Sequence, residues 1–265
     1  MDATLVEPVA GFNVGKAWVV IFASPDDLGR AAATQAAGVI ASAIRERGRA
    51  RIIVGTGNSQ DRLIHWLTQQ PGIDWSAVEV FHMDEYVGMP MTHSASFRRW
   101  LKTHLADLVP AGGTFHYLAG DAADIDAEIA RYAAELARAP IDLCFIGFGE
   151  NGHIAFNDPH EADFNDPKPI KRVRLDEKCR MQQVGEGHFP SLDAAPLEAL
   201  TLTCPTLMSA REAIAVVPEG RKAQAVKDAL QGPLGTSCPA SLVLTHPSVT
   251  LYLDKDSASL LSRAQ

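Results

Sequence analysis

The chain has 265 residues, of which 46% are hydrophobic and 21% are charged. This composition is that of an ordinary soluble globular protein, so a disordered, collagen-like or disulfide-built chain is excluded. Lys and Arg number 24 against 32 Asp and Glu, which gives a net charge of -8. The acidic balance argues against general binding of nucleic acid or of anionic membranes, but it leaves room for a local cationic site that holds a small phosphate.

The four cysteines are widely spaced and form no CxxC pair, which argues against a disulfide framework and a sequence-local zinc site. The remaining histidines outside the motifs below form no HxH or HxxxH pattern, so we expect no metal. The apolar run at residues 17–23 is far shorter than the ~18 residues of a membrane span, and no basic leader precedes it. We therefore expect a cytoplasmic protein that does not bind membranes.

The first half of the chain alternates apolar strands with helices. Residues 17–23 predict a strand, and Ser24-Pro25 then gives an N-cap and a first-turn proline for a helix that reaches Arg47 and ends at Gly48. Further strands are predicted at residues 50–54 and 78–82. Helices are predicted from the spacing of Leu63, Ile64 and Leu67, and over residues 96–108 and 125–139.

The second half continues this alternation. Residues 141–149 form a continuous apolar run that is typical of a strand covered on both faces. Strands at 213–217 and 250–253 enclose a helix at 221–230. The pattern predicts an α/β fold with a mostly parallel sheet. Residues 160–196 differ, because they are rich in Asp, Pro, Lys and Gly and have weak periodicity. We predict a single domain, 1–265, with a lid-like insertion at about 160–196, of which residues 161–189 bury little apolar surface.

Three strand ends carry polar groups, and ligands of α/β sheets bind at such ends. The first is the turn Gly55–Ser59, where Gly57, Asn58 and Ser59 suggest a phosphate cradle at a helix N-terminus. An ordinary strand–helix turn explains the same residues, since the turn is neither a Walker A loop nor a dinucleotide fingerprint.

The second strand end is Asp84-Glu85, two adjacent acids directly after an apolar strand. Paired carboxylates can act as a general base and its orienting group, because partial burial raises a carboxyl pKa. A structural turn or capping pair is the alternative.

The third end holds Asn151, His153 and Asp158. A histidine beside amide and carboxylate groups can have its tautomer fixed while it moves protons, whereas the alternative is a hydrogen-bonded structural histidine.

These stretches resemble, in order and spacing, the signature stretches of glucosamine-6-phosphate deaminases. The resemblance is carried by GTGNS, by FHMDEYVG with SFRRWLKTHL, and by GFGENGHIAFNDP, and it extends through LDEKCR, ALTLTCPTLMSA, VVPEGRKAQAV and HPSVTLYLD. It implies a Rossmann-like three-layer α/β sandwich and conversion of glucosamine 6-phosphate to fructose 6-phosphate and ammonia. It also implies that no metal or organic cofactor is needed.

The resemblance assigns roles to individual residues. His153 would open the sugar ring, oriented by Asn151 and Asp158, and Asp84 would move the C2 proton toward C1. The implied substrate- and phosphate-binding residues are Gly57, Asn58, Ser59, Lys222, Glu85 and Arg180.

The chain departs from the family pattern at several of these positions. Asn151 stands where many members have aspartate, and Asp158 replaces the usual glutamate. Asn58-Ser59-Gln60 replaces the commoner Gly-Thr-Pro. The stretch QQVGEGHF occupies the place of a phosphate-binding arginine, for which Arg180 is the nearest candidate.

Two other functions stay open. One is a 6-phosphogluconolactonase-like hydrolase, which needs no base for the carbon chain. The other is a non-catalytic sugar-phosphate sensor, which could lose either Asp84 or His153. The sequence leaves open the oligomeric state, including a homo-oligomer, and the identity of the amino sugar.

Overall fold

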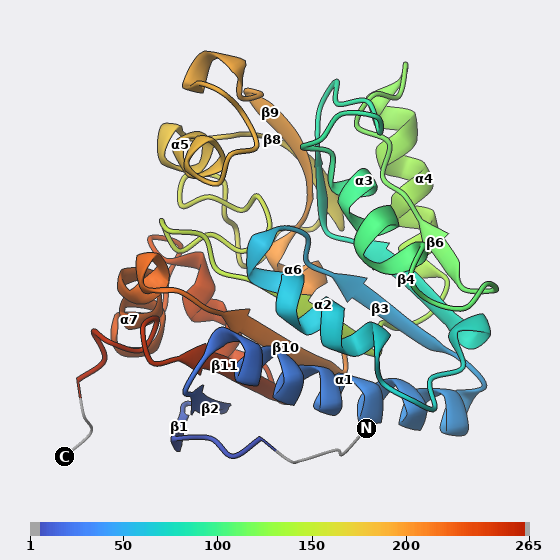
Figure 1. Cartoon of the computed structure of the whole chain (residues 1–265). Helices are drawn as coiled ribbons and strands as arrows, with labels where there is room; N and C mark the ends of the chain where they lie inside the picture. Colours follow the sequence, from blue (N-terminus) through green and yellow to red (C-terminus); the bar gives the residue numbers. More distant parts are fainter. Residues whose placement is uncertain (1–5, 263–265) are drawn as a thin grey trace.

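Eight strands form the central sheet of the protein (Figure 1). The computed structural model describes residues 6–262, so the first five and last three residues of the predicted domain lie outside it. Neighbouring strands are parallel except for the first pair, which is antiparallel. The predicted mostly parallel sheet is thus confirmed. In spatial order its strands are β1 (Ala10–Val14), β2 (Ala17–Phe22), β11 (Val249–Asp254), β10 (Glu212–Val217), β7 (Leu143–Ile146), β3 (Ala50–Val54), β4 (Val78–His82) and β6 (Thr114–His116).

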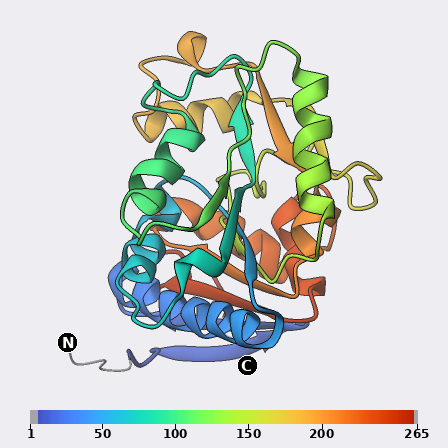
Figure 2. The same cartoon turned by 90° about the vertical axis from the view of Figure 1, so that its right-hand side faces the viewer.

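Helices cover both faces of this sheet (Figure 2). Successive side chains of a strand point to opposite faces, and in β3 Ile53 joins one hydrophobic cluster whereas Ile52 and Val54 join the other. The two clusters form the two helix–sheet interfaces of the predicted three-layer fold. One contains α1 (Pro25–Arg47), α2 (Asp61–Thr68) and α3 (Phe97–Leu101); the other contains α4 (Ile125–Ala137), α6 (Cys204–Met208) and α7 (Ala223–Gln231).

The two ends of α1 lie at the residues that the sequence predicted, with Ser24 as the N-cap and Gly48 at the C-terminal end. Ser24 Oγ accepts the backbone N–H of Asp27 at 3.2 Å, and Pro25 occupies the first helical position. Gly48 adopts the left-handed conformation with φ 74° and donates its N–H to the carbonyl of Ile44. The cap residues therefore satisfy backbone groups that the helix itself leaves unpaired.

A smaller antiparallel sheet lies at one end of the large one, beside α5 (Glu177–Gly185) (Figure 1). Its strands, in spatial order, are β5 (Asp84–Tyr86), β9 (Glu198–Leu202) and β8 (Ile170–Arg174). The predicted insertion at 160–196 supplies both β8 and α5. The expectation that it buries little apolar surface is wrong: Val173, Cys179 and Phe189 are buried in a cluster with Tyr86. Of the five residues in the short strand β8 only Ile170 and Val173 are apolar, and both are buried.

Short helical turns connect these elements. The predicted helix at 96–108 is α3 continued by a π-helical turn at Lys102–Ala106. None of the helices within residues 6–262 is long and apolar enough to cross a membrane. The 3-10 turns are Asn58–Gln60, Trp75–Ala77, Leu192–Ala194, Gly220–Lys222 and Pro239–Thr245.

Candidate active site

A cavity opens at the carboxyl ends of the central parallel strands, which is the edge where the sequence predicted a ligand site. The loops after β3, β4, β7 and β10 each contribute to its wall, and the polypeptide around α5 closes another part of it. Of the predicted site residues, six line this cavity: Gly57, Asn58, Ser59, Asp84, His153 and Lys222.

The loop after β3 forms one part of the wall and leads into α2. Gly57 has φ 112°, which is a conformation that residues with a Cβ rarely adopt. Buried Gln60 donates its side-chain N–H to the carbonyl of Ile146 at 3.3 Å and so ties the loop to β7. Backbone N–H groups at the start of a helix favour a bound anion, so the loop suits a phosphate.

Lys222 supplies a cation to the same cavity. It is 2% exposed and lies in the turn between β10 and α7. Burial lowers the pKa of its ammonium group to about 8, against a partly compensating attraction from Glu186. The side chain is therefore still largely protonated at neutral pH, which suits a group that pairs with a phosphate.

Asp84, the first residue of β5, is 6% exposed. Burial raises the pKa of its carboxyl group well above the ordinary value, and the neighbouring Glu85 raises it further. The nearest side-chain donor is the Thr56 hydroxyl, 3.5 Å from Oδ1. A carboxylate with so little stabilisation of its charge accepts a proton readily, which is the property of a general base that must abstract a weakly acidic proton.

His82 holds the backbone of Asp84 in place. The N–H of Leu118 donates to its Nε2 at 2.9 Å, so Nδ1 carries the hydrogen and donates to the carbonyl of Asp84 at 2.8 Å. Burial lowers the pKa of this histidine to about 4, which keeps the ring neutral and preserves this tautomer at physiological pH. Sequence reasoning gave His82 no role, and only its position two residues before Asp84 could have indicated the contact.

Glu85, a predicted substrate-binding residue, lies outside the cavity. Adjacent residues of a strand point in opposite directions, so Glu85 faces away from the side that Asp84 presents. Its carboxylate accepts the Ser96 hydroxyl at 2.7 Å and the backbone N–H groups of Phe97 and Arg98 at 3.2 and 3.0 Å. These are the first N–H groups of α3. Glu85 therefore caps a helix, which was the structural alternative for the acidic pair.

Arg180, the predicted phosphate residue, also lies outside the cavity. From α5 its guanidinium donates to the backbone carbonyls of Leu192 and Ala195, which holds the segment that follows the helix. Within residues 6–262 no arginine lines the cavity. The stretch QQVGEGHF instead places four side chains on its wall, which sequence reasoning did not assign to the site: Gln182, Gln183, Glu186 and His188.

Glu186 brings a negative charge to the cavity. Burial alone would raise its pKa, but His188, Arg221 and Lys222 lower it to about 2. Its Oε1 accepts a hydrogen bond from Arg221 and lies 4.0 Å from Nζ of Lys222. The carboxylate thus connects the end of α5 with the cationic turn before α7.

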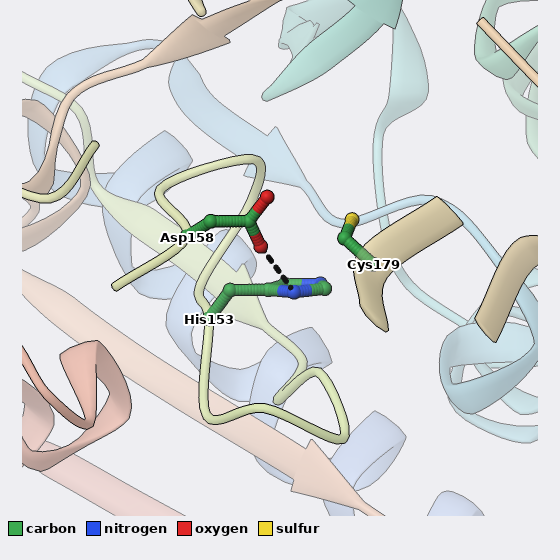
Figure 3. Close-up of side chains that lie close together, drawn as sticks. All are labelled: His153, Asp158 and Cys179. Carbon is green, nitrogen blue, oxygen red and sulfur yellow. Dashed lines mark ion pairs between the residues drawn. The ribbon is translucent and has the colours of Figure 1, made fainter. Parts of the chain in front are cut away.

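His153 enters the cavity from the loop after β7 and is 7% exposed. A Cβ on Gly149 would lie only 2.2 to 2.4 Å from three atoms of the imidazole, so a glycine is required for the ring to occupy this place. Nδ1 lies 3.0 Å from Oδ1 of Asp158 (Figure 3). The backbone N–H of His153 donates to the side-chain oxygen of Asn151 at 3.1 Å.

Asn151 and Asp158 lie behind the imidazole. The Asn151 amide donates to Asp158 at 2.9 Å and to Asp176 at 3.1 Å, and the N–H of Asp176 donates to the other oxygen of Asp158 at 3.2 Å. Burial favours protonation of Asp158, but the imidazole of His153 and these donors prevail and lower its pKa. Asp158 is therefore a fixed negative charge 3.0 Å from Nδ1 of the histidine.

Together these features define a class of protein: an α/β enzyme whose cavity brings a glycine-rich loop, a buried lysine, a carboxyl group of raised pKa and a carboxylate-supported histidine to one sheet edge. Residues 23–252 match the family model for glucosamine-6-phosphate isomerases and 6-phosphogluconolactonases. The chain belongs to this family.

The relatives and solved structures agree with this assignment. Glucosamine-6-phosphate deaminases of Bacillus cereus (strain B4264) and Bacillus thuringiensis (strain Al Hakam) are each 36% identical over 192 residues, 72% of this chain and 71% of the relative. The structure of a monomeric glucosamine-6-phosphate deaminase is 26% identical, with a TM-score of 0.82 over 92% of this chain and 99% of that one. A 6-phosphogluconolactonase from Shewanella baltica OS155, 20% identical with a TM-score of 0.74 over 92% of this chain and 97% of that one, shares the fold.

Proposed function

We propose that the protein is a glucosamine-6-phosphate deaminase, which converts glucosamine 6-phosphate and water into fructose 6-phosphate and ammonia. The observation that carries the proposal is the presence of Asp84 and His153 on the wall of one cavity together with a glycine-rich loop and a buried lysine. The Bacillus relatives bear the name of this activity. Its setting would be amino-sugar breakdown, including that of N-acetylglucosamine, in the cytoplasm.

Substrate binding depends on the phosphate. The backbone of Gly57–Ser59 and the ammonium of Lys222 would hold it, since both are on the cavity wall and both favour an anion. Because these contacts are made equally in the bound substrate and in the transition state, they chiefly set the affinity for the sugar phosphate.

Ring opening is the task of His153. The imidazole would accept the proton of the anomeric hydroxyl group and deliver a proton to the ring oxygen as the bond between that oxygen and C1 breaks. During the transfer the ring is positively charged, and the carboxylate of Asp158 beside Nδ1 stabilises this state. Asn151 contributes by holding both the backbone of His153 and the carboxylate of Asp158.

Isomerisation is the task of Asp84. Its carboxylate would remove the proton from C2 of the open aldehyde, leaving an enolamine, and a proton is then added at C1. The resulting imine at C2 takes up water, and cleavage of the C2–N bond releases ammonia and the ketose phosphate. The raised pKa of Asp84 strengthens it as a base for this carbon-bound proton.

Ammonia release tests this proposal. Purified protein is expected to release ammonia from glucosamine 6-phosphate and to form fructose 6-phosphate in equal amount, while hydrolysis of 6-phosphogluconolactone stays at the background rate. Lactone hydrolysis without ammonia release would instead establish the lactonase. Binding of glucosamine 6-phosphate with turnover of neither compound would establish a sensor.

A further inference from the structure

A third side chain lies beside His153 and Asp158 and has no part in the proposed reaction. Cys179, on α5, brings its sulfur so close that one ligand atom from each of the three residues lies within 4.8 Å of the others (Figure 3). All three residues are buried. Two come from the loop after β7 and the third from the opposing helix, so the fold itself assembles an imidazole, a carboxylate and a thiol.

A second observation concerns the imidazole. Nδ1 of His153 is buried and has no hydrogen-bond partner within residues 6–262, although Oδ1 of Asp158 is 3.0 Å away. The ion pair with this carboxylate is thus the contact that holds the nitrogen, and it leaves the nitrogen available to a bound ion. A nitrogen and an oxygen that are close but not aligned for a hydrogen bond are compatible with two ligands of one ion.

The spacing fits a small tetrahedral ion after minor adjustment. Zinc binds nitrogen and oxygen at about 2.0–2.2 Å and sulfur at about 2.3 Å, which places ligand atoms roughly 3.3–3.6 Å apart. The nitrogen–oxygen pair must open by only a few tenths of an ångström, and the sulfur must move by at most roughly 1.2–1.5 Å.

We propose that His153, Asp158 and Cys179 form a binding site for a thiophilic divalent cation such as Zn²⁺, and that the bound ion inhibits the enzyme. A set of one sulfur, one imidazole and one carboxylate selects zinc over magnesium or calcium, which prefer oxygen. Binding forms a bond from zinc to the sulfur and releases the thiol proton to solvent. The inhibitory part rests on the proposed function, because a metal-bound His153 can no longer move the ring-opening proton.

The neighbouring group of Asp158, His160 and Asp176 is a weaker alternative for the same ion. It contains no sulfur, and His160 is exposed. Its members are also engaged: Nε2 of His160 is 2.9 Å from the carbonyl of Arg174, and Asp176 accepts the amide of Asn151. These contacts would have to break. The site at Cys179 instead uses Nδ1 of His153, which makes no hydrogen bond within residues 6–262, so that only the Asn151 amide contact to Asp158 would have to adjust.

Cobalt gives a direct readout of the site. Metal-free protein titrated with Co²⁺ is expected to show the near-ultraviolet absorption of a thiolate–cobalt bond and the visible bands of a four-coordinate ion, at one equivalent, and Zn²⁺ should abolish both. Cys179→Ser should lose the near-ultraviolet band. Cys204→Ser, at another buried cysteine, should keep it. Thermal unfolding in EDTA shows whether each variant is folded. If Cys179→Ser does not fold, His153→Gln takes its place and is expected to weaken cobalt binding at least tenfold.

Ammonia release then tests the inhibition. Zn²⁺ should inhibit the wild type and Cys204→Ser at the same concentration. Cys179→Ser should need at least tenfold more Zn²⁺ for the same fractional inhibition, measured against its own metal-free rate. Absence of the thiolate–cobalt band, or its persistence in Cys179→Ser, would overturn the site. If metal-free wild type releases no ammonia, the proposed function fails, but a cobalt band that depends on Cys179 would still establish the site.

Discussion

Asp84 and Asp158 are both buried aspartates at the same edge of the sheet, yet their pKa values are shifted in opposite directions. The pKa of Asp84 is raised by burial and by Glu85, with one hydroxyl at 3.5 Å to offset them. The pKa of Asp158 is lowered in spite of burial, because an imidazole, an amide and a backbone N–H surround it. The comparison teaches that the available partners, rather than depth alone, decide whether a carboxyl group serves as a proton acceptor or as a fixed charge.

Asn151 belongs to this difference. Its amide donates to the carboxylates of both Asp158 and Asp176. An aspartate at position 151 would bring a third carboxylate to this place and remove the shared donor, so like-charge repulsion would raise the pKa of Asp158. The asparagine thus has a physical reason in the presence of Asp176, because its amide can donate to both carboxylates.

The largest expected effect comes from Asp84→Asn. The amide has nearly the same shape but cannot accept the C2 proton, and loss of a general base costs ~10²–10⁴-fold in rate. Ammonia release should fall by this factor, while calorimetry with glucitol 6-phosphate, which cannot isomerise, should show unchanged affinity. Turnover of Asp84→Asn within a few-fold of the wild type would show that Asp84 is not the general base. The matched control is Asp256→Asn, at an exposed aspartate.

Asp158 should show a different profile. Asp158→Ala removes the orienting charge, and misplacement of a catalytic group costs ~10²-fold, so the rate on cyclic substrate should fall by about this factor. Asp158→Glu keeps the charge and should retain a measurable part of the activity, and His153→Gln should be worse than either. A wild-type rate for Asp158→Ala would reduce this carboxylate to a structural residue of the loop.

Lys222→Ala should chiefly affect binding. A hydrogen bond to a charged group is worth ~1.5–3 kcal/mol, so KM should rise roughly 10- to 100-fold with a smaller change in kcat. The exposed Lys227→Ala on α7 is the matched control. Inhibition by inorganic phosphate gives an independent check, and equal inhibition of the Lys222→Ala variant and the wild type would show that Lys222 does not hold the phosphate.

Stability should separate the two aspartates by sign. The folded-state pKa of Asp84 is above its unfolded value, so its contribution is present at low pH and is lost as the pH rises through the folded pKa. Asp84→Asn should therefore raise the free energy of unfolding at pH 7. The pKa of Asp158 is lowered, so its contribution is present above the unfolded pKa and is lost as the pH falls through the folded pKa.

Asp158→Asn should accordingly be less stable than the wild type at pH 7, by ~1–3 kcal/mol for a disrupted buried network. Urea unfolding of both variants at pH 7 measures these differences. Shifts of the same sign in Asp84→Asn and Asp158→Asn would contradict the proposed contrast.

The sequence predicted the large sheet well and the small one poorly, for a physical reason. Strands buried on both faces, such as residues 50–54, are continuous apolar runs that stand out without context. The strands β5 and β8 are short, and polar residues occupy much of their length. Their burial depends on contacts with Phe97 and Phe156, which are distant along the chain or come from another element.

The same limit applies to the site. Asp84, His153 and Lys222 could be placed together because each follows a predicted parallel strand. Glu85 could not be excluded beforehand, since its direction depends on the pairing of β5 with β9, which no local pattern shows. Glu186 reaches the cavity only because the segment around α5 packs back over it, which is a tertiary contact that the composition of 160–196 does not indicate.

Carbon-13 NMR of the aspartate carboxyl groups tests the contrast between Asp84 and Asp158 most directly. Titration of uniformly labelled, metal-free protein, with the two signals assigned through Asp84→Asn and Asp158→Asn, gives both pKa values in one experiment. We predict that the Asp84 signal titrates above the ordinary aspartate value of 3.8 and that the Asp158 signal titrates below it. Two signals that titrate together near 3.8, or in the reverse order, would contradict the assignment of proton acceptor and fixed charge.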